Sequence, residues 1–85
     1  MYYVYVLYSK KQNKFYIGLT NNLKKRILEH QRNKVHTTYR MRSPKLVYFE
    51  ACLSKQDAQI REKQLKTGFG RGYLRRRLKK FLMRT

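Results

Sequence analysis

Acidic side chains are scarce in this chain, where four of them stand against 22 lysines and arginines. The four are Glu29, Glu50, Asp57 and Glu62. A hard divalent cation is held in proteins by oxygen ligands, above all by carboxylates. The scarcity therefore narrows the choice of metal ligands to very few positions.

Cysteine and long apolar runs are also nearly absent. Cys52 is the only cysteine, which excludes an intrachain disulfide and a cysteine-cluster zinc site. We expect it to be a small apolar strand residue. No run of about 18 apolar residues could form a transmembrane helix, and the N-terminus lacks the basic-then-apolar order of a signal peptide. These absences predict a cytoplasmic protein.

What the chain has in abundance is positive charge. Its formal net charge is +18, while aromatic residues still make up 14% of the 85 positions. A chain of this length forms one domain, 1–85, with a modest core. So many like charges repel one another, and a polyanion that releases its condensed counterions on binding is the expected partner. Nucleic acid, DNA foremost, fits best; we expect no membrane contact because the basic residues are interleaved with strand and helix signals.

Three segments have the composition of strands. Residues 2–8 are almost all aromatic or β-branched, 15–17 repeat this character after a polar turn, and 45–52 form a third such run. The first two should pair antiparallel as a hairpin, with Gly18 ending the second. Alternation leaves large side chains on both faces of the first strand, so helices should cover both faces of the sheet.

Residues with the pattern of a helix follow the predicted hairpin and also the third predicted strand. A helix over about 22–32 is indicated by Leu23, Ile27 and Leu28, with Thr20, Asn21 or Asn22 as the cap. A second helix opens at Ser54 in a capping-box pattern and runs to about Lys66. Glycines in 67–72 interrupt the pattern before a final helix. The polar stretch 33–43 is either a phosphate-facing loop or a solvated connector.

The predicted order is therefore β-β-α-β-α-α. We expect an α/β (α+β) fold, in which a three-stranded, mainly antiparallel sheet is flanked by about three helices.

Several short motifs coincide along this framework. They are Tyr3-Val4-Tyr5, Tyr16-Ile17-Gly18, the pair Arg26 and His30 four residues apart, and the helix 58–66 that carries Glu62. In order and spacing these resemble the signature of the GIY-YIG nucleases, and most closely the small stand-alone bacterial proteins of the UPF0213 type. The likeness covers nearly the whole chain. It implies a GIY-YIG endonuclease-like fold and a metal-dependent endonuclease that hydrolyses phosphodiester bonds.

The resemblance assigns roles to five residues. Arg26 offers a planar charged fork for two phosphate oxygens, and by resemblance it steadies the transition-state phosphate. Tyr5 is implied to be the general base, with Tyr16 lining the site and His30 orienting water or phosphate. Glu62 is implied to hold Mg²⁺ or Mn²⁺. The residues alone leave plainer alternatives open: tyrosines that only pack, a helix-end cation at His30, and an ion pair between Glu62 and Lys66.

A set of basic side chains is expected to bind the nucleic acid backbone without sequence preference. It consists of Lys24, Lys25, Lys63, Lys66, Arg71, Arg75 and Arg76. The expected substrates are branched, flapped or damaged DNA in repair or recombination, and targeting is expected to come from a protein partner or a homodimer. The alternative function is a non-catalytic basic module that binds DNA or RNA; a third is an RNA-associated structural protein.

Overall fold

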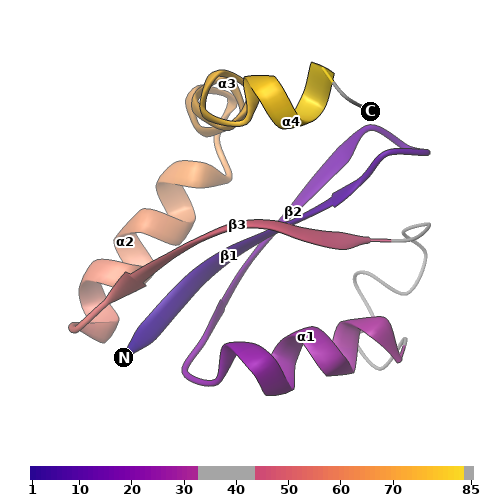
Figure 1. Ribbon diagram of the computed structural model, residues 1–85. Helices are drawn as coiled ribbons and strands as arrows, with labels where there is room; N and C mark the ends of the chain where they lie inside the picture. Colours follow the sequence, from indigo (N-terminus) through magenta and orange to yellow (C-terminus); the bar gives the residue numbers. More distant parts are fainter. Residues whose placement is uncertain (33–43, 84–85) are drawn as a thin grey trace.

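The computed structural model describes residues 1–32 and 44–83. At its centre lies a three-stranded antiparallel sheet in the order β2-β1-β3 (Figure 1). The strands are β1 (Tyr2–Ser9), β2 (Lys14–Thr20) and β3 (Lys45–Cys52), and the helices are α1 (Leu23–Gln31), α2 (Lys55–Leu65), α3 (Gly68–Arg77) and α4 (Lys79–Met83). The predicted fold class and element order are confirmed, and the structure adds the short α4.

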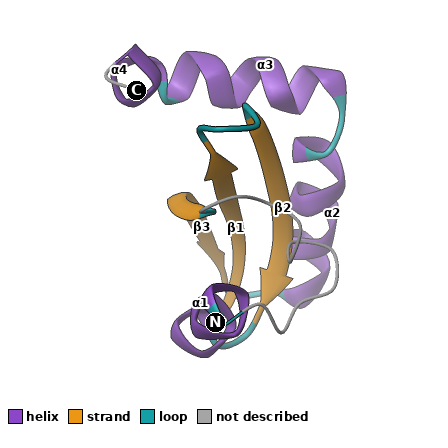
Figure 2. Cartoon of the chain, turned by 90° about the vertical axis from the view of Figure 1, so that its right-hand side faces the viewer, coloured by secondary structure: helices purple, strands orange, loops and turns teal. Residues whose placement is uncertain are grey.

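The middle strand is buried on both of its faces. Val4, Tyr5 and Val6 are fully buried and Leu7 is 1% exposed, as the run of aromatic and β-branched residues predicted. Val4 and Val6 belong to a core cluster with side chains of β2, α2 and α3, whereas Tyr5 points the other way. Figures 1 and 2 accordingly show α1 on one face of the sheet and α2, with α3 beyond it, on the other.

The helix starts are fixed by side-chain caps. Asn22 caps α1, with its Oδ1 accepting a hydrogen bond from the backbone N–H of Lys25 at 3.1 Å. Ser54 Oγ accepts the backbone N–H of Asp57 at 3.4 Å and so caps α2. Both caps were among the positions predicted from the sequence. The predicted loop 33–43 lies outside the described residues.

Two predictions about glycine are wrong. Gly18 does not end β2, which continues to Thr20 and pairs there with Tyr3. The predicted break between the two helices is present, but it spans Lys66 and Thr67 alone, and the glycines belong to α3, which begins at Gly68. Thr67 caps this helix, and a side chain at Gly70 would overlap the backbone of Leu65 at the end of α2. Glycine is thus needed here for the close contact of two helices. The C-terminal helix is divided at position 78 into α3 and α4.

A polar cluster ties the edge strand β3 to the helices on its face. The Glu50 carboxylate accepts three hydrogen bonds from Arg61 of α2, two from Nε at 2.9 and 3.1 Å and one from Nη2 at 2.9 Å, and it accepts one from Tyr48 at 2.7 Å. Tyr48 in turn meets the Tyr73 hydroxyl of α3 at 3.1 Å, and the Arg61 guanidinium lies over the Tyr73 ring. Burial opposes ionisation of Glu50, but the hydrogen bonds from Arg61 and Tyr48 outweigh it and lower the pKa of this carboxyl.

Two features noted in the composition, the single cysteine and the lack of long apolar runs, can be compared with this fold. Cys52 is a half-buried residue of β3 that packs against the core cluster, as predicted. Within residues 1–32 and 44–83, none of the helices combines the length and the apolarity needed to cross a membrane.

Candidate active site

Tyr5 occupies the middle of the central strand, and its ring lies directly over Gly18. The two residues are paired across β1 and β2. Side chains of paired residues in an antiparallel sheet lie on the same face. A Cβ atom at Gly18 would overlap the far end of the Tyr5 ring, including its hydroxyl. The absence of a side chain at Gly18 is therefore what lets the Tyr5 ring lie flat along the sheet, with its hydroxyl directed at α1.

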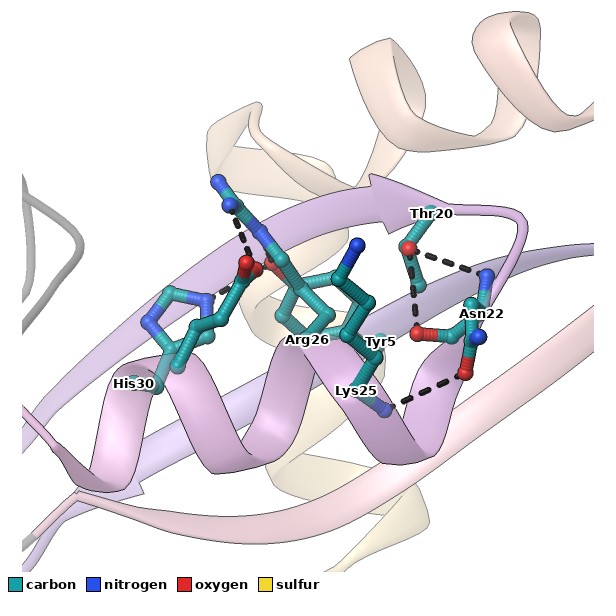
Figure 3. A network of polar contacts seen from close by, with 7 residues as sticks. Tyr5, Thr20, Asn22, Lys25, Arg26 and His30 are labelled. Atoms are coloured by element: carbon teal, nitrogen blue, oxygen red, sulfur yellow. Dashed lines mark hydrogen bonds and ion pairs between the residues drawn. The ribbon is translucent and has the colours of Figure 1, made fainter.

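Helix α1 brings two polar side chains to this hydroxyl (Figure 3). The Tyr5 oxygen lies 2.8 Å from His30 Nε2 and accepts a hydrogen bond from Arg26 Nε at 3.3 Å. Arg26 and His30 share a face of α1 because they are four residues apart. His30 is 1% exposed, so this contact is enclosed.

Tyr16 completes the cluster from the neighbouring strand. It is paired with Leu7 and so shares the face of Tyr5. Its ring centroid lies 6.3 Å from that of Tyr5 and 5.2 Å from that of His30. The structure therefore brings Tyr5, Tyr16, Arg26 and His30 together, and we refer to these residues as the tyrosine cluster.

Burial sets the protonation states in the tyrosine cluster. It raises the pKa of Tyr5 to about 12, because the loss of solvent and the neighbouring Tyr16 outweigh the favourable charge of Arg26. Burial also lowers the pKa of His30, and the positive charge of Arg26 acts in the same direction, against the smaller opposing effect of Glu29. At neutral pH the phenol is thus protonated and the imidazole neutral, and the Tyr5 O–H donates to His30 Nε2 in the tautomer that carries the imidazole proton on Nδ1.

Arg26 is held on its other side by Glu29. Its Nη1 donates to Glu29 Oε1 at 3.1 Å, three residues along α1. The hydrogen bonds to Tyr5 and Glu29 raise the pKa of Arg26, while burial opposes them. About a third of the Arg26 side chain, 36%, is exposed, so an incoming phosphate can reach it. The positioning role of Glu29 was not predicted, although the three-residue spacing on a helix was a signal for it.

Glu62 lies on α2, the helix that packs on the opposite face of the sheet from α1 (Figure 1). Its carboxylate forms an ion pair with Lys66 at 3.2 Å, and its side chain is 20% exposed. This pair is the plainer alternative that the sequence left open. In the described part of the chain, no group of three or more histidine, cysteine or acidic side chains converges around a metal position. A lone carboxylate fits a Mg²⁺ ion that keeps several of its water ligands.

Similarity to known proteins identifies the family of this chain. The family model of the GIY-YIG catalytic domain matches residues 1–74. The chain belongs to the GIY-YIG family. It is 41% identical over 85 residues to a UPF0213 protein of Limosilactobacillus reuteri, covering 96% of this chain and 82% of that one. It is 46% identical over 67 residues to a UPF0213 protein of Clostridium perfringens, covering 78% and 71%. No solved structure matches the chain.

Membership of the GIY-YIG family implies a nuclease-like function and a nucleic acid substrate. GIY-YIG nucleases generally use a divalent metal. Four of the five residues to which the resemblance assigned roles form the tyrosine cluster, and the fifth is Glu62 on α2. The roles themselves stay predictions.

The basic residues predicted to contact nucleic acid are all exposed in this GIY-YIG domain. They are Lys24 and Lys25 on α1, Lys63 on α2 and Lys66 at its C-terminal cap, and Arg71, Arg75 and Arg76 on α3. The Arg75 guanidinium lies over the Phe15 ring and donates to Asn13 Oδ1 at 3.4 Å. The set thus extends over helices on both faces of the sheet.

Proposed function

We propose that this protein is a metal-dependent endonuclease that hydrolyses phosphodiester bonds in DNA. The observation that carries the proposal is the Tyr5 hydroxyl, held between Arg26 and His30 inside the tyrosine cluster. A tyrosine that served packing alone would not need a cation and a neutral imidazole on its oxygen. Branched, flapped or damaged DNA in repair or recombination is the proposed setting.

Tyr5 acts as the general base by passing its own proton onward. With a pKa of about 12, Tyr5 holds its proton at neutral pH. Tyr5 is fully buried in the free protein, so the attacking water reaches its oxygen only when substrate binding opens the tyrosine cluster. As that water loses a proton to the Tyr5 oxygen, the Tyr5 proton moves to His30 Nε2, 2.8 Å away. The lowered pKa of His30 supports this step, because it keeps the imidazole neutral and able to accept.

Arg26 stabilises the phosphate as negative charge develops on its oxygens. A guanidinium fixed on one side by Tyr5 and on the other by Glu29 is already oriented before substrate arrives. Tyr16 lines the cluster and restricts where the water and the phosphate can sit.

Glu62 is the residue that would hold Mg²⁺ or Mn²⁺. When bound, such an ion supplies charge neutralisation at the phosphate and acidifies a water ligand. Only 20% of the Glu62 side chain is exposed, and Lys66 neutralises the carboxylate in its absence. Exposed lysines and arginines on α1, α2 and α3 then supply affinity for the backbone without sequence preference.

One observation favours a second function, a basic module that binds DNA or RNA without cleaving it. The Glu62 carboxylate is paired with Lys66, which could serve helix stability alone. The net charge of +18 would support binding equally well. A binding module would not, however, require the buried Tyr5, Arg26 and His30 arrangement.

The decisive experiment measures cleavage of labelled single-stranded, duplex, flap and branched DNA, and of RNA, with Mg²⁺, Mn²⁺ or EDTA. Wild type is compared with Glu62→Ala and Arg26→Ala, and with Arg77→Ala as a control that removes an exposed arginine on α3. The nuclease proposal expects metal-dependent cleavage in wild type and Arg77→Ala only. If every variant binds nucleic acid and none cleaves any substrate, the binding module is the better account.

A further inference from the structure

A cavity of about 400 Å³ opens beside the tyrosine cluster, at the end of the sheet where α1 and α2 both begin. It shares Arg26 with the cluster, but Tyr5, Tyr16 and His30 do not line it. Its size falls within the range of about 300 to 1,000 Å³ typical of small-molecule pockets. The cavity is therefore a distinct space, large enough for a nucleotide, that adjoins the residue expected to hold the scissile phosphate.

The charges around this cavity favour an anion. Lys25, Arg26 and Lys55 supply three cations, from the first turns of α1 and α2. Glu29 is the acidic residue in the lining, and its carboxylate is already bound to Arg26. Lys25 and Lys55 are both exposed, so their ammonium groups can adjust to a phosphate.

The rest of the lining suits a base. Tyr2 and Leu19 contribute apolar surface, and both are only partly buried. An aromatic ring offers a stacking surface to any base, and the Asn21 amide beside it can hydrogen-bond to a base edge. A base that is paired and stacked in a duplex cannot enter a side pocket, whereas an unpaired base can.

We propose that this cavity is a subsite for one unpaired nucleotide of the substrate strand, next to the bond presented to Arg26. Lys25 and Lys55 bind its phosphate, and the Tyr2 ring stacks on its base. The inference rests on the proposed nuclease function and adds a substrate class to it: nucleic acid with an unpaired nucleotide beside the cleavage position. Neither Tyr2 nor Lys55 was predicted from the sequence to touch nucleic acid, because they come from the first strand and from a helix far along the chain.

The test measures binding in EDTA, so that cleavage plays no part. The probes are a labelled blunt duplex, the same duplex with a short single-stranded overhang, and the same overhang built from abasic nucleotides, which keeps the phosphates and removes the bases. Wild type is compared with Lys55→Gln and Tyr2→Ala. Lys79→Gln is the control, because Lys79 is likewise exposed and is likewise the first residue of a helix.

Wild type should bind the normal overhang about tenfold more tightly than the abasic one, the effect of one stacked base. Tyr2→Ala should lose this preference. Lys55→Gln should weaken binding of the overhang several-fold and leave the blunt duplex unchanged, whereas Lys79→Gln should change both equally. Because Tyr2 also packs on the core and its loss could unfold the protein, the exposed Lys55 carries the test independently.

Equal affinity of wild type for normal and abasic overhangs would overturn the subsite. So would a Lys55→Gln variant that weakens blunt duplex and overhang by the same factor. A base-dependent preference without any cleavage would leave the subsite standing while the nuclease proposal failed.

Discussion

Replacing Gly18 with alanine should disturb the tyrosine cluster without removing any functional group. The added methyl group would overlap the Tyr5 ring near its hydroxyl end. Tyr5 is fully buried and paired with Gly18 across the sheet, so neither residue can move away freely. The ring must therefore shift, and its hydroxyl must leave the positions that meet Arg26 and His30.

The size of the effect follows from two opposing contributions. Alanine in place of a glycine whose backbone conformation it tolerates stabilises a protein by about 0.4 to 1 kcal/mol. Overpacking of a dense core costs about 1 to 3 kcal/mol, and the loss of the Tyr5 hydrogen bonds adds about 1 kcal/mol. We expect Gly18→Ala to lower the free energy of unfolding by about 1 to 3 kcal/mol, which lowers Tm by roughly 5 to 20 °C in a chain of this size.

Urea unfolding of single and double variants separates the overlap from other effects. In a Tyr5→Leu background the side chain no longer reaches the methyl group, so Gly18→Ala should cost little there. The double-mutant cycle should then show a coupling energy of about 1 kcal/mol or more. Gly68→Ala is the matched control, because the nearest atom to its new Cβ is 3.7 Å away in the Arg71 side chain. If Gly18→Ala is as stable as Gly68→Ala, or if the cycle shows no coupling, the packing argument for Gly18 is refuted.

Two further predictions concern protonation and the β3 cluster. The pKa of His30 should lie below 6.5, so the free energy of unfolding should fall as pH drops below 6.5, because the unfolded chain then binds the proton more readily; an imidazole NMR titration midpoint at or above 6.5 would contradict this. Arg61→Ala should lower the free energy of unfolding at pH 7 by about 1 to 3 kcal/mol, because Glu50 loses charged hydrogen bonds. That loss should shrink as pH falls through the lowered pKa of Glu50. Equal stability of Arg61→Ala and Arg77→Ala in urea would show that the cluster contributes nothing.

The sheet and the helix starts could be predicted because short-range signals determine them. The aromatic and β-branched run in 2–8 is typical of a central strand, and the bounds of β3 were predicted to the residue. Asn22 and Ser54 act within one helical turn of their own positions. The convergence of Arg26 and His30 followed from their spacing on one helix.

The glycines were misread because their roles depend on distant contacts. Gly18 has the composition signal of a strand end, but β2 continues to Thr20, and glycine stands at 18 because the Tyr5 ring occupies the space above it. Gly70 sits inside a helix, where glycine is normally unfavourable, because α2 approaches too closely for a side chain. Neither neighbour is visible from the local sequence.

Site features formed by separate elements were missed for a related reason. The cavity beside Arg26 joins residues from β1, α1 and α2, and no spacing rule relates Tyr2 to Lys55. Glu29, by contrast, could have been assigned to Arg26 from the three-residue spacing alone.

The most direct test of the central claim is the cleavage rate of Tyr5→Phe measured beside its affinity for the same DNA. This substitution keeps the ring over Gly18 and removes only the hydroxyl between Arg26 and His30. If the hydroxyl is the base, cleavage should fall by about 100-fold or more while Kd stays within about twofold of wild type. A Tyr5→Phe variant that cleaves DNA at the wild-type rate would contradict the account.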